Sequence, residues 1–266
     1  MVFCKETFAA VLLERKTKAL RKSTNSPELR SSLDDGLSSK QAITHALVRP
    51  MKLLLLSPIV TLMSIYTAII YGILYLLFTT YTFVYEEEYR FSPSTVGLSY
   101  ISTGIGFFLG LFLIGGSADR IFKALKEKNN GAAKPEYRLP PLLFGAWFVP
   151  AGLFLYGWTA QYHIQWAVPM LGGLLFGIGM IAALLCIQNY LIDAFGVYAA
   201  SALAANTLLR SIVGGLLPLA GLKMYNALGL GWGNSLIGFL SLAMIPIPFA
   251  FYKYGETIRK KYPVKL

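Results

Sequence analysis

The sequence contains few of the residues that build disulfide scaffolds, metal centres or soluble surfaces. Its 266 residues include two cysteines, two histidines and 14% charged side chains. The cysteines, Cys4 and Cys186, are too few for a disulfide scaffold or a thiolate cluster. The histidines, His45 and His163, lie far apart in the sequence, which argues against a zinc or di-iron site. We therefore expect no metal and no cofactor.

The motifs of common enzyme classes are also missing. The chain has no H-E-x-x-H, no G-x-S-x-G and no P-loop pattern, and no pair of aspartates lies within an apolar run. These absences argue against an enzyme, and against transport driven by ATP hydrolysis in this chain.

Apolar residues, in contrast, make up 55% of the chain, and the mean hydropathy is +0.56. A soluble domain of this length cannot bury so much apolar surface. Six apolar runs are long enough to cross a bilayer core of about 30 Å as helices, which satisfy their own backbone hydrogen bonds in lipid. These runs cover residues 58–82, 94–116, 139–160, 166–192, 199–222 and 231–251. The sequence therefore predicts an all-α integral membrane protein with six transmembrane helices.

The basic residues predict how these helices are oriented. The chain has 24 Lys and Arg against 13 Asp and Glu, a net charge of +11. With both termini in the cytoplasm, 21 basic residues lie on the inner side, two lie on the outer side, and Arg210 lies within a span. The first outer loop is acidic at 86–88, whereas the inner loop 193–198 has no basic residue. The positive-inside rule therefore predicts cytoplasmic termini, and it explains the basic charge without nucleic acid as a partner.

Polar segments flank the predicted bundle. We assign residues 1–50 to a basic arm, 51–254 to the six-helix bundle and 255–266 to a basic tail. Within the arm, 8–22 is predicted as a helix and 23–39 as a linker; the inner connection 117–138 is also predicted as a loop. The arm either attracts anionic lipid head groups or is a solvated linker.

Polar residues inside the apolar runs are the best candidates for a substrate path. A central arginine such as Arg210 costs about 2.5–3.5 kcal/mol in a membrane, so it must face protein or water. Asn206 lies one turn before Arg210, and Asn189 and Asp193 share one helix face at the end of the fourth run. We interpret all four as lining the path. Asn189 and Asp193 are candidate cross-helix neighbours of Arg210, but the sequence does not set the helix register, and Asp193 and Arg210 need not touch. The alternative is a static ion pair or a helix cap.

Aromatic residues concentrate in the first run. Tyr71 and Tyr75 are four residues apart and share a face, which suits a cavity for amphipathic or cationic ligands. Ordinary packing or a membrane-interface belt is the alternative. Three G-x-x-x-G patterns, which permit close approach of helices, occur at Gly106/Gly110, Gly173/Gly177 and Gly229/Gly233.

The segment after the second run carries a recognisable motif. Residues 115–123, Gly-Gly-Ser-Ala-Asp-Arg-Ile-Phe-Lys, resemble the G-x-x-x-D-R-x-G-R loop of major facilitator superfamily transporters, with Phe122 at the position of a usual glycine. Strings at 135–140, 190–196 and 198–211 resemble the fungal drug:proton antiporter branch of that superfamily. The string at 6–16 resembles the end of the family's sixth helix.

The resemblance covers nearly the whole chain but only the C-terminal half of the family's twelve-helix fold. It implies export of small organic molecules such as drugs, secondary metabolites or polyamines, with protons as the coupling ion and the plasma membrane as the location. It also implies a second six-helix half, or a second copy of the chain, as a partner. Gly115, Asp119 and Arg120 match the family's cytoplasmic latch between halves. Without the other half, we expect Asp119 and Arg120 to face water without a partner.

Two other functions stay open at this point. The chain could be a truncated transporter remnant without transport activity of its own, or a membrane scaffold subunit. The genomic sequence upstream of the start codon distinguishes a fragment from an independent half. Sizing the protein in detergent distinguishes a paired half from a lone one.

Overall fold

The computed structural model of the chain describes residues 9–24, 29–30 and 39–262, which contain helices and no strands. The predicted all-helical class is therefore confirmed for this part of the chain. In order, the elements are α1 (Ala9–Thr24), α2 (Ser39–Leu56), α3 (Pro58–Phe83), η1 (Val84–Glu88), α4 (Pro93–Val96), α5 (Ser99–Gly110), η2 (Leu111–Gly115), α6 (Gly116–Lys128), η3 (Pro135–Arg138), α7 (Pro140–Gly145), α8 (Phe148–Gln161), α9 (Ala167–Phe195), η4 (Gly196–Tyr198), α10 (Ala199–Met244) and α11 (Pro246–Lys261). The turns η1 and η2 are π-helical, and η3 and η4 are 3₁₀ turns.

The chain divides into two compact units, Met1–Val48 and Arg49–Leu266. In the first unit, α1 confirms the helix predicted from residue 8, and its Lys18 Nζ lies 2.7 Å from the Glu14 carboxylate. Most of the linker expected at 23–39, the string at 6–8 and Cys4 lie outside the described residues.

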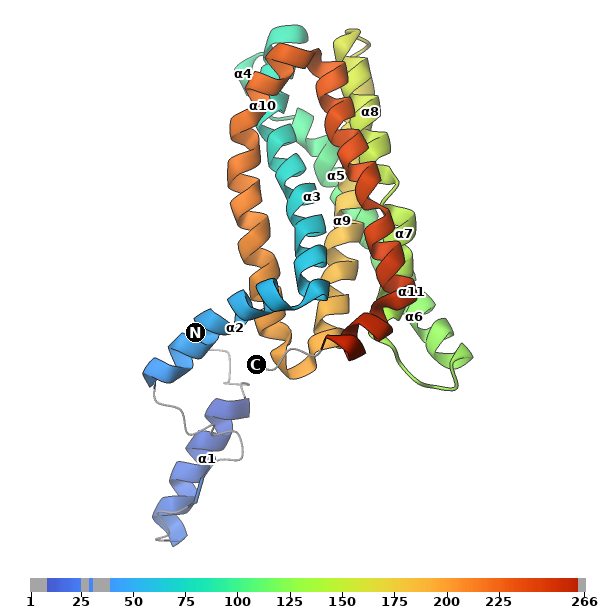
Figure 1. The fold of residues 1–266 in the computed structure, drawn as a ribbon. Helices are drawn as coiled ribbons and strands as arrows, with labels where there is room; N and C mark the ends of the chain where they lie inside the picture. Colours follow the sequence, from blue (N-terminus) through green and yellow to red (C-terminus); the bar gives the residue numbers. More distant parts are fainter. Residues whose placement is uncertain (1–8, 25–28, 31–38, 263–266) are drawn as a thin grey trace. The chain divides into compact units, whose positions relative to one another are not determined.

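Four segments of the second unit are long and apolar enough to cross a membrane: Pro58–Glu88, Pro93–Lys128, Pro135–Gln161 and Ala167–Lys261. The fourth is 95 residues long and contains α9, α10 and α11. Its helices turn back at Gly196, where φ is 48°, and at Gly229, where φ is 75° and ψ is 171° (Figure 1). The left-handed φ at both positions is one that glycine adopts readily because it has no Cβ. The protein is thus a multi-pass helical membrane protein, and the count of six spans stays a prediction.

One predicted boundary is wrong. The loop expected at 117–138 is helical over Gly116–Lys128. Its apolar residues recur at helical spacing and turn inward, so α6 packs against η2, η3 and α7 while its lysines face outward. The span expected at 139–160 lies within the membrane-length segment Pro135–Gln161, in which a short turn separates α7, ending at Gly145, from α8, beginning at Phe148.

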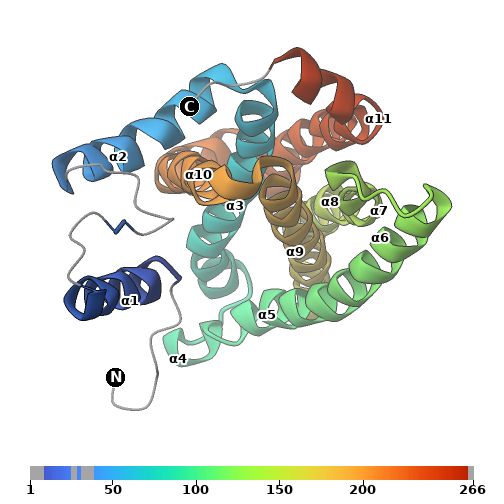
Figure 2. The ribbon, with the colours of Figure 1, turned by 90° about the horizontal axis from the view of Figure 1, so that it is seen from below.

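Helix α9 is the centre of the bundle and contacts α3, α5, α7, α8 and α10 (Figure 2). Two of the predicted glycine patterns meet at its contact with α5. A Cβ atom on Gly177 would lie 3.1 Å from Gly106 Cα, and one on Gly110 would lie 3.1 Å from Ile178 Cα. The small residues therefore let α5 and α9 approach backbone to backbone. The third pattern has a different role, because Gly229 is the bend inside α10.

Helices α3 and α10 form a second close pair and run parallel. Gly72 packs against Val213 and Leu217, and Gly221 packs against Leu76. Because both helices begin at the same end of the bundle, residues at similar distances from their starts lie side by side. Asn206 Nδ2 donates a hydrogen bond to Thr67 Oγ1 across this contact, at 3.4 Å.

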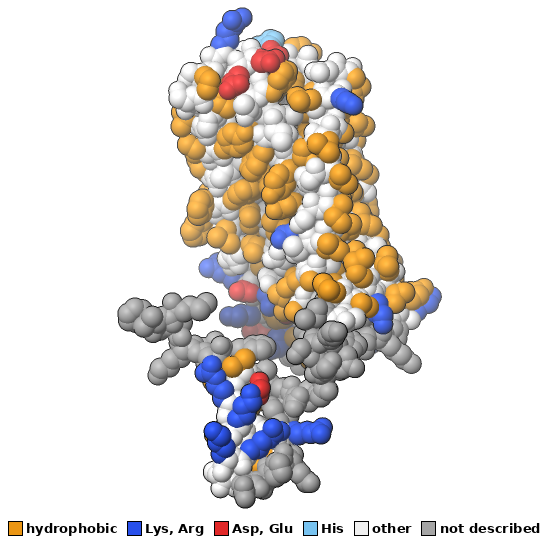
Figure 3. All heavy atoms as spheres, turned by 90° about the vertical axis from the view of Figure 1, so that its left-hand side faces the viewer, with side chains coloured by type: hydrophobic (Ala, Val, Ile, Leu, Met, Phe, Trp, Pro, Cys, Tyr) orange, Lys and Arg blue, Asp and Glu red, His pale blue; other side chains and the backbone are white. Residues whose placement is uncertain are grey.

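The side of the second unit that carries α10 shows a band of hydrophobic side chains (Figure 3). Exposed apolar residues of α10 include Leu208, Ile212, Leu216, Leu219 and Leu222. We call the end with the lysines of α6 and α11 the basic end, and the end with Glu86–Glu88 the acidic end. An apolar band between two charged ends is the surface expected of a membrane-embedded bundle.

Candidate functional site

The α3–α10 pair brings together four of the predicted path residues: Asn206 is buried between the two helices, and Tyr71, Tyr75 and Arg210 lie on the open side of the pair, where they are half-buried or exposed. We call Tyr71, Tyr75, Asn206 and Arg210 the Arg210 face. At a rise of about 1.5 Å per residue, Arg210 lies roughly 16 Å from the start of α10, and Tyr71 roughly 20 Å from the start of α3. Both depths fall within the apolar part of the helices.

The Tyr71 ring holds the Arg210 side chain against α3, and Tyr75 packs beside Tyr71. The guanidinium carbon of Arg210 lies 5.0 Å from the centre of the Tyr71 ring, within the range of a cation–π contact. The hydroxyl groups of Tyr71 and Tyr75 are 3.4 Å apart, and their ring centres are 5.1 Å apart. Gly214 makes room for both rings, since a Cβ there would lie 3.1 Å from Tyr71 Cδ1 and 3.3 Å from Tyr75 Cδ2.

Arg210 is a half-buried cation without a counter-charge on its own helix pair. Its Nε atom is buried and has no hydrogen-bond partner. None of the acidic side chains in the described ranges forms an ion pair with it. Helix α3 carries no charged residue, and Arg210 is the first charged residue of α10, followed by Lys223. Asn206, in contrast, is 2% exposed and uses its amide to tie α10 to α3.

No hydrogen bond or ion pair in the described part of the chain joins Arg210 to Asp193 or Asn189, the candidate cross-helix neighbours. Asp193 belongs to a separate cluster at the basic end, described below. Asn189 is half-buried on α9, and within the described part of the chain no hydrogen bond joins it to Arg210. The expectation required a helix register that spacing within one helix cannot provide.

Arg138 is the centre of the cluster at the basic end. We define the Arg138 cluster as Asp119, Phe122, Arg138 and Asp193. Arg138 donates from Nε to Asp193 Oδ2 and from Nη1 to Asp119 Oδ1, both at 2.8 Å. Its guanidinium carbon also lies 4.1 Å from the centre of the Phe122 ring. One side chain thus joins α6, η3 and α9.

This cluster corrects the expectation that Asp119 has no partner. Asp119 is paired within the chain, although its side chain is 74% exposed. Arg120 is exposed and forms no ion pair with any residue that the structure describes. Gly115 ends the π-helical turn η2 just before the motif. Phe122, where the motif usually has glycine, supplies the aromatic face under Arg138.

A second group of charges ties η3 to α11 at the same end. Glu136 is 4% exposed, and its Oε1 lies 3.4 Å from Arg259 Nη2. Lys134 Nζ donates to Glu256 Oε2 at 2.7 Å, and Lys260 Nζ donates to the other oxygen of Glu256, also at 2.7 Å. The hydrogen bond to Glu256 raises the pKa of Lys134 above its usual value.

Sequence reasoning missed Arg138 and Glu136 as site residues. Both lie in the string at 135–140 that carried the family resemblance, yet they were treated only as loop charges. The carboxylates that pair with Arg138 are 19 and 55 residues away in the sequence. No local pattern reveals such pairs, and the recognisable string was the available signal.

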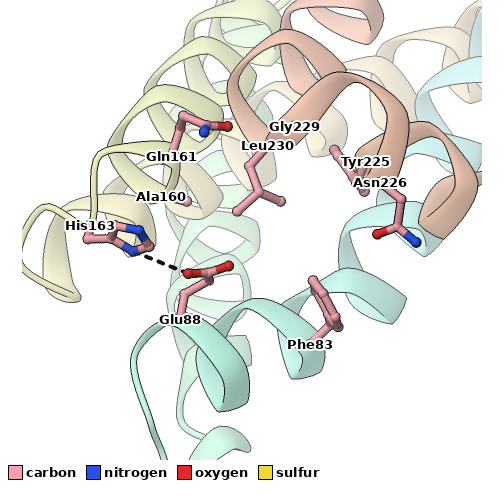
Figure 4. Close-up of a pocket in the computed structure, with 9 residues that line it drawn as sticks. All are labelled: Phe83, Glu88, Ala160, Gln161, His163, Tyr225, Asn226, Gly229 and Leu230. Atoms are coloured by element: carbon pink, nitrogen blue, oxygen red, sulfur yellow. Dashed lines mark ion pairs between the residues drawn. The ribbon is translucent and has the colours of Figure 1, made fainter.

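A small cavity of about 180 Å³ lies at the acidic end (Figure 4). Its lining residues come from α3, η1, α8 and the bend of α10, and Glu88 and His163 point toward one another across it. His163 Nδ1 lies 3.3 Å from Glu88 Oε2, and Gln161 Oε1 accepts a hydrogen bond from the Gly231 amide at 3.1 Å. The cavity is smaller than pockets that hold drug-sized molecules. We therefore assign its polar residues to holding the bend of α10 and not to binding a substrate.

A larger groove of about 380 Å³ lies between α5 and α9. Its lining residues are Gly104, Phe107, Phe108, Leu111, Ile181, Leu184, Leu185 and Gln188. This volume is within the range of ligand pockets, and the lining is apolar except for Gln188.

Comparison with known proteins gives a consistent family. The chain is 52% identical over 265 residues to the MFS-type transporter tndD of Aspergillus flavipes, covering 98% of this chain and 49% of that protein. It is 54% identical over 255 residues to the MFS-type transporter penM of Penicillium rubens, covering 96% and 50%. It is 48% identical over 269 residues to the efflux pump radE of Floropilus chiversii, covering 100% and 50%. The chain thus spans about half the length of the curated relatives it matches, and no solved structure matches it.

The family match itself covers most of the chain. Residues 7–218 match the Major Facilitator Superfamily, and they include α3, the Arg138 cluster and the Arg210 face. The relatives are transporters rather than enzymes, which agrees with the absence of catalytic motifs. The helical membrane bundle, the D-R motif and this match agree, and the chain belongs to the major facilitator superfamily.

Proposed function

We propose that the chain forms one six-helix half of a proton-coupled transporter that exports small organic molecules, such as drugs, secondary metabolites or polyamines. The names of the relatives, MFS-type transporter and efflux pump, support transport as the activity. The observation that carries the proposal is the position of Arg210 on the open side of the α3–α10 pair.

A cation at this depth cannot face lipid without a cost of about 2.5–3.5 kcal/mol. Arg210 is only half-buried by its own bundle, so its side of α3 and α10 must meet protein or water. In transporters built from two halves, the substrate site lies near the membrane midplane between them. A second six-helix half with a wet path between the halves satisfies both requirements.

The candidate residues take distinct roles in this arrangement. Tyr71, Tyr75 and Arg210 contact the substrate, while Asn206 holds α10 in register with α3. Asn189 lines the path near the basic end. Asp193 acts in the Arg138 cluster and supports the helix ends at the cytoplasmic side.

The latch residues also separate into two roles. Asp119 is engaged with Arg138, whereas Arg120 is free to contact the second half. Gly115 ends the turn that leads into this segment. The second half is either another chain or a second copy of this one. Each half contributes six spans, the complex lies in the plasma membrane, and the termini of this chain are cytoplasmic.

Reconstitution in proteoliposomes tests the proposal. The chain is reconstituted alone and together with the N-terminal half of its Penicillium rubens relative, and export of rhodamine 6G and of fluorescein is followed under an imposed pH gradient. We expect export in at least one of the two preparations, with loss of export after addition of a protonophore. Export that ignores the pH gradient would refute proton coupling and leave the transport proposal in place.

The second candidate function is a transporter remnant without activity of its own. It agrees with the unpaired Arg210, whose buried Nε finds no partner in the described part of the chain. Absence of export from both preparations, with correctly folded chain in the liposomes, would establish it and refute transport.

A further inference from the structure

We infer that the Arg210 face binds the negative group of an organic acid, a carboxylate or an enolate attached to an apolar body, and discriminates against organic cations. The inference rests on the proposed function and narrows its substrates to organic acids, which removes the cationic polyamines from the proposed set. Three observations on the α3–α10 pair carry it.

The first observation is that the aromatic face is already occupied by a cation. An aromatic ring attracts an ammonium ligand through its negative π-face. Here the Arg210 guanidinium lies over the Tyr71 ring at 5.0 Å. A second cation at this ring would meet the positive charge of Arg210, so the structure reverses the cationic preference that the tyrosines suggest in sequence.

The second observation is the set of unused donors on Arg210. A guanidinium carries five N–H donors in a planar fork that matches the two oxygens of a carboxylate. Nε of Arg210 is buried without a hydrogen-bond partner, and no acidic side chain in the described ranges pairs with the residue. The α3–α10 pair therefore presents an uncompensated positive charge whose donors point to an anion as the missing partner.

The third observation is the pair of tyrosine hydroxyls beside this charge. The Tyr71 and Tyr75 hydroxyl oxygens are 3.4 Å apart, so one hydroxyl donates to the other. The accepting hydroxyl keeps its own proton available for a ligand oxygen. Tyr75 is 41% exposed, so its ring can also contact the apolar body of the ligand.

Equilibrium binding to the purified full chain in a neutral detergent tests the inference. The probes are 2-naphthoate, 2-naphthamide and 2-naphthylmethylammonium, which share one apolar body and differ in charge. A charge-assisted hydrogen bond on a partly exposed cation predicts that naphthoate binds about tenfold more tightly than the amide. The ammonium should bind most weakly. Nearly equal affinities for the three probes would overturn the inference.

Two variants locate the effect. Arg210→Gln should abolish the preference for naphthoate over the amide, and a single symmetric gel-filtration peak with an unchanged helical circular-dichroism spectrum shows that the variant is folded. Lys223→Gln is the matched control, because it removes the same charge from the same helix at an exposed position. Should Arg210→Gln fail to fold, Tyr71→Phe replaces it and should weaken naphthoate binding about threefold and amide binding by less. A preference that survives in the folded variant overturns the inference.

The same probes separate this inference from transport. Selective naphthoate binding by a chain that exports nothing would support the inference and count against the proposed function. Equal export of naphthoate and naphthamide would support transport and overturn the inference. A carboxylate of the second half is the competing counter-ion. Loss of naphthoate binding when the second half is added would assign Arg210 to that carboxylate and overturn the inference.

Discussion

Replacing Arg138 should loosen the basic end of the bundle more than any other single charge change there. Arg138 makes two hydrogen bonds of 2.8 Å to carboxylates and one cation–π contact of 4.1 Å, and these contacts join η3 to α6 and α9. Arg138→Gln removes all three contacts and leaves a shorter, neutral side chain.

The exposure of each partner sets the size of the effect. Asp119 is 74% exposed, so the Asp119–Arg138 pair should contribute about 0.5 kcal/mol to the free energy of unfolding. Asp193 is 32% exposed, so the Asp193–Arg138 pair should contribute about 1 kcal/mol. The contact with Phe122 adds about 0.5–1 kcal/mol. Arg138→Gln should therefore cost about 2 kcal/mol, and Arg138→Lys about 1 kcal/mol because lysine keeps the charge but loses the planar fork. Asp193→Asn should cost about 1 kcal/mol and Asp119→Asn about 0.5 kcal/mol.

Labelling of Cys186 by a thiol-reactive dye gives a direct assay. Cys186 is buried on α9, so it reacts when the bundle opens, and a Cys4→Ser background removes the other thiol. The free energy of unfolding is then measured in mixed micelles with increasing denaturing detergent. Arg120→Gln is the matched control, because it deletes the same charge from an exposed residue of α6.

Two results would refute this reasoning. Equal losses of stability for Arg138→Gln and Arg120→Gln would show that the cluster contributes only through net charge. A loss for Asp119→Asn as large as that for Asp193→Asn would show that exposure does not rank the two pairs.

Three further predictions address packing, topology and transport. Gly106→Ala should destabilise the bundle by about 1–3 kcal/mol, because the new Cβ would lie 3.0 Å from the carbonyl carbon of Leu174. Gly104→Ala is the control and should change stability little, because no atom lies within 4 Å of a Cβ there. Thermal unfolding of the two variants compares them. A cysteine at Ser92 should react with an impermeant reagent added outside intact cells and one at Ala132 should not, and the opposite pattern would overturn the predicted orientation. Arg210→Lys should lower efflux per inserted molecule, measured against membrane protein level, because lysine lacks the guanidinium fork; unchanged normalised efflux would remove Arg210 from the substrate path.

The amino-acid sequence by itself determined the membrane class, the helical content and the glycine patterns that let helices approach closely. Each of these depends on local chemistry, since a run of about 20 apolar residues must form a helix in lipid and glycines four residues apart share one face of it. The family resemblance was likewise readable, because it lies in contiguous strings such as 115–123 and 135–140.

Only the tertiary structure decided which charges meet. Asp193 and Arg210 are both costly residues at the end and in the middle of apolar runs, and the sequence left open whether they are neighbours. The packing of α3 parallel to α10 instead places Arg210 on Tyr71, while the ends of α6, η3 and α9 converge so that Arg138 reaches Asp193. Periodicity within a helix specifies which side chains share a face, but the register and neighbours of that helix depend on how all the helices pack together.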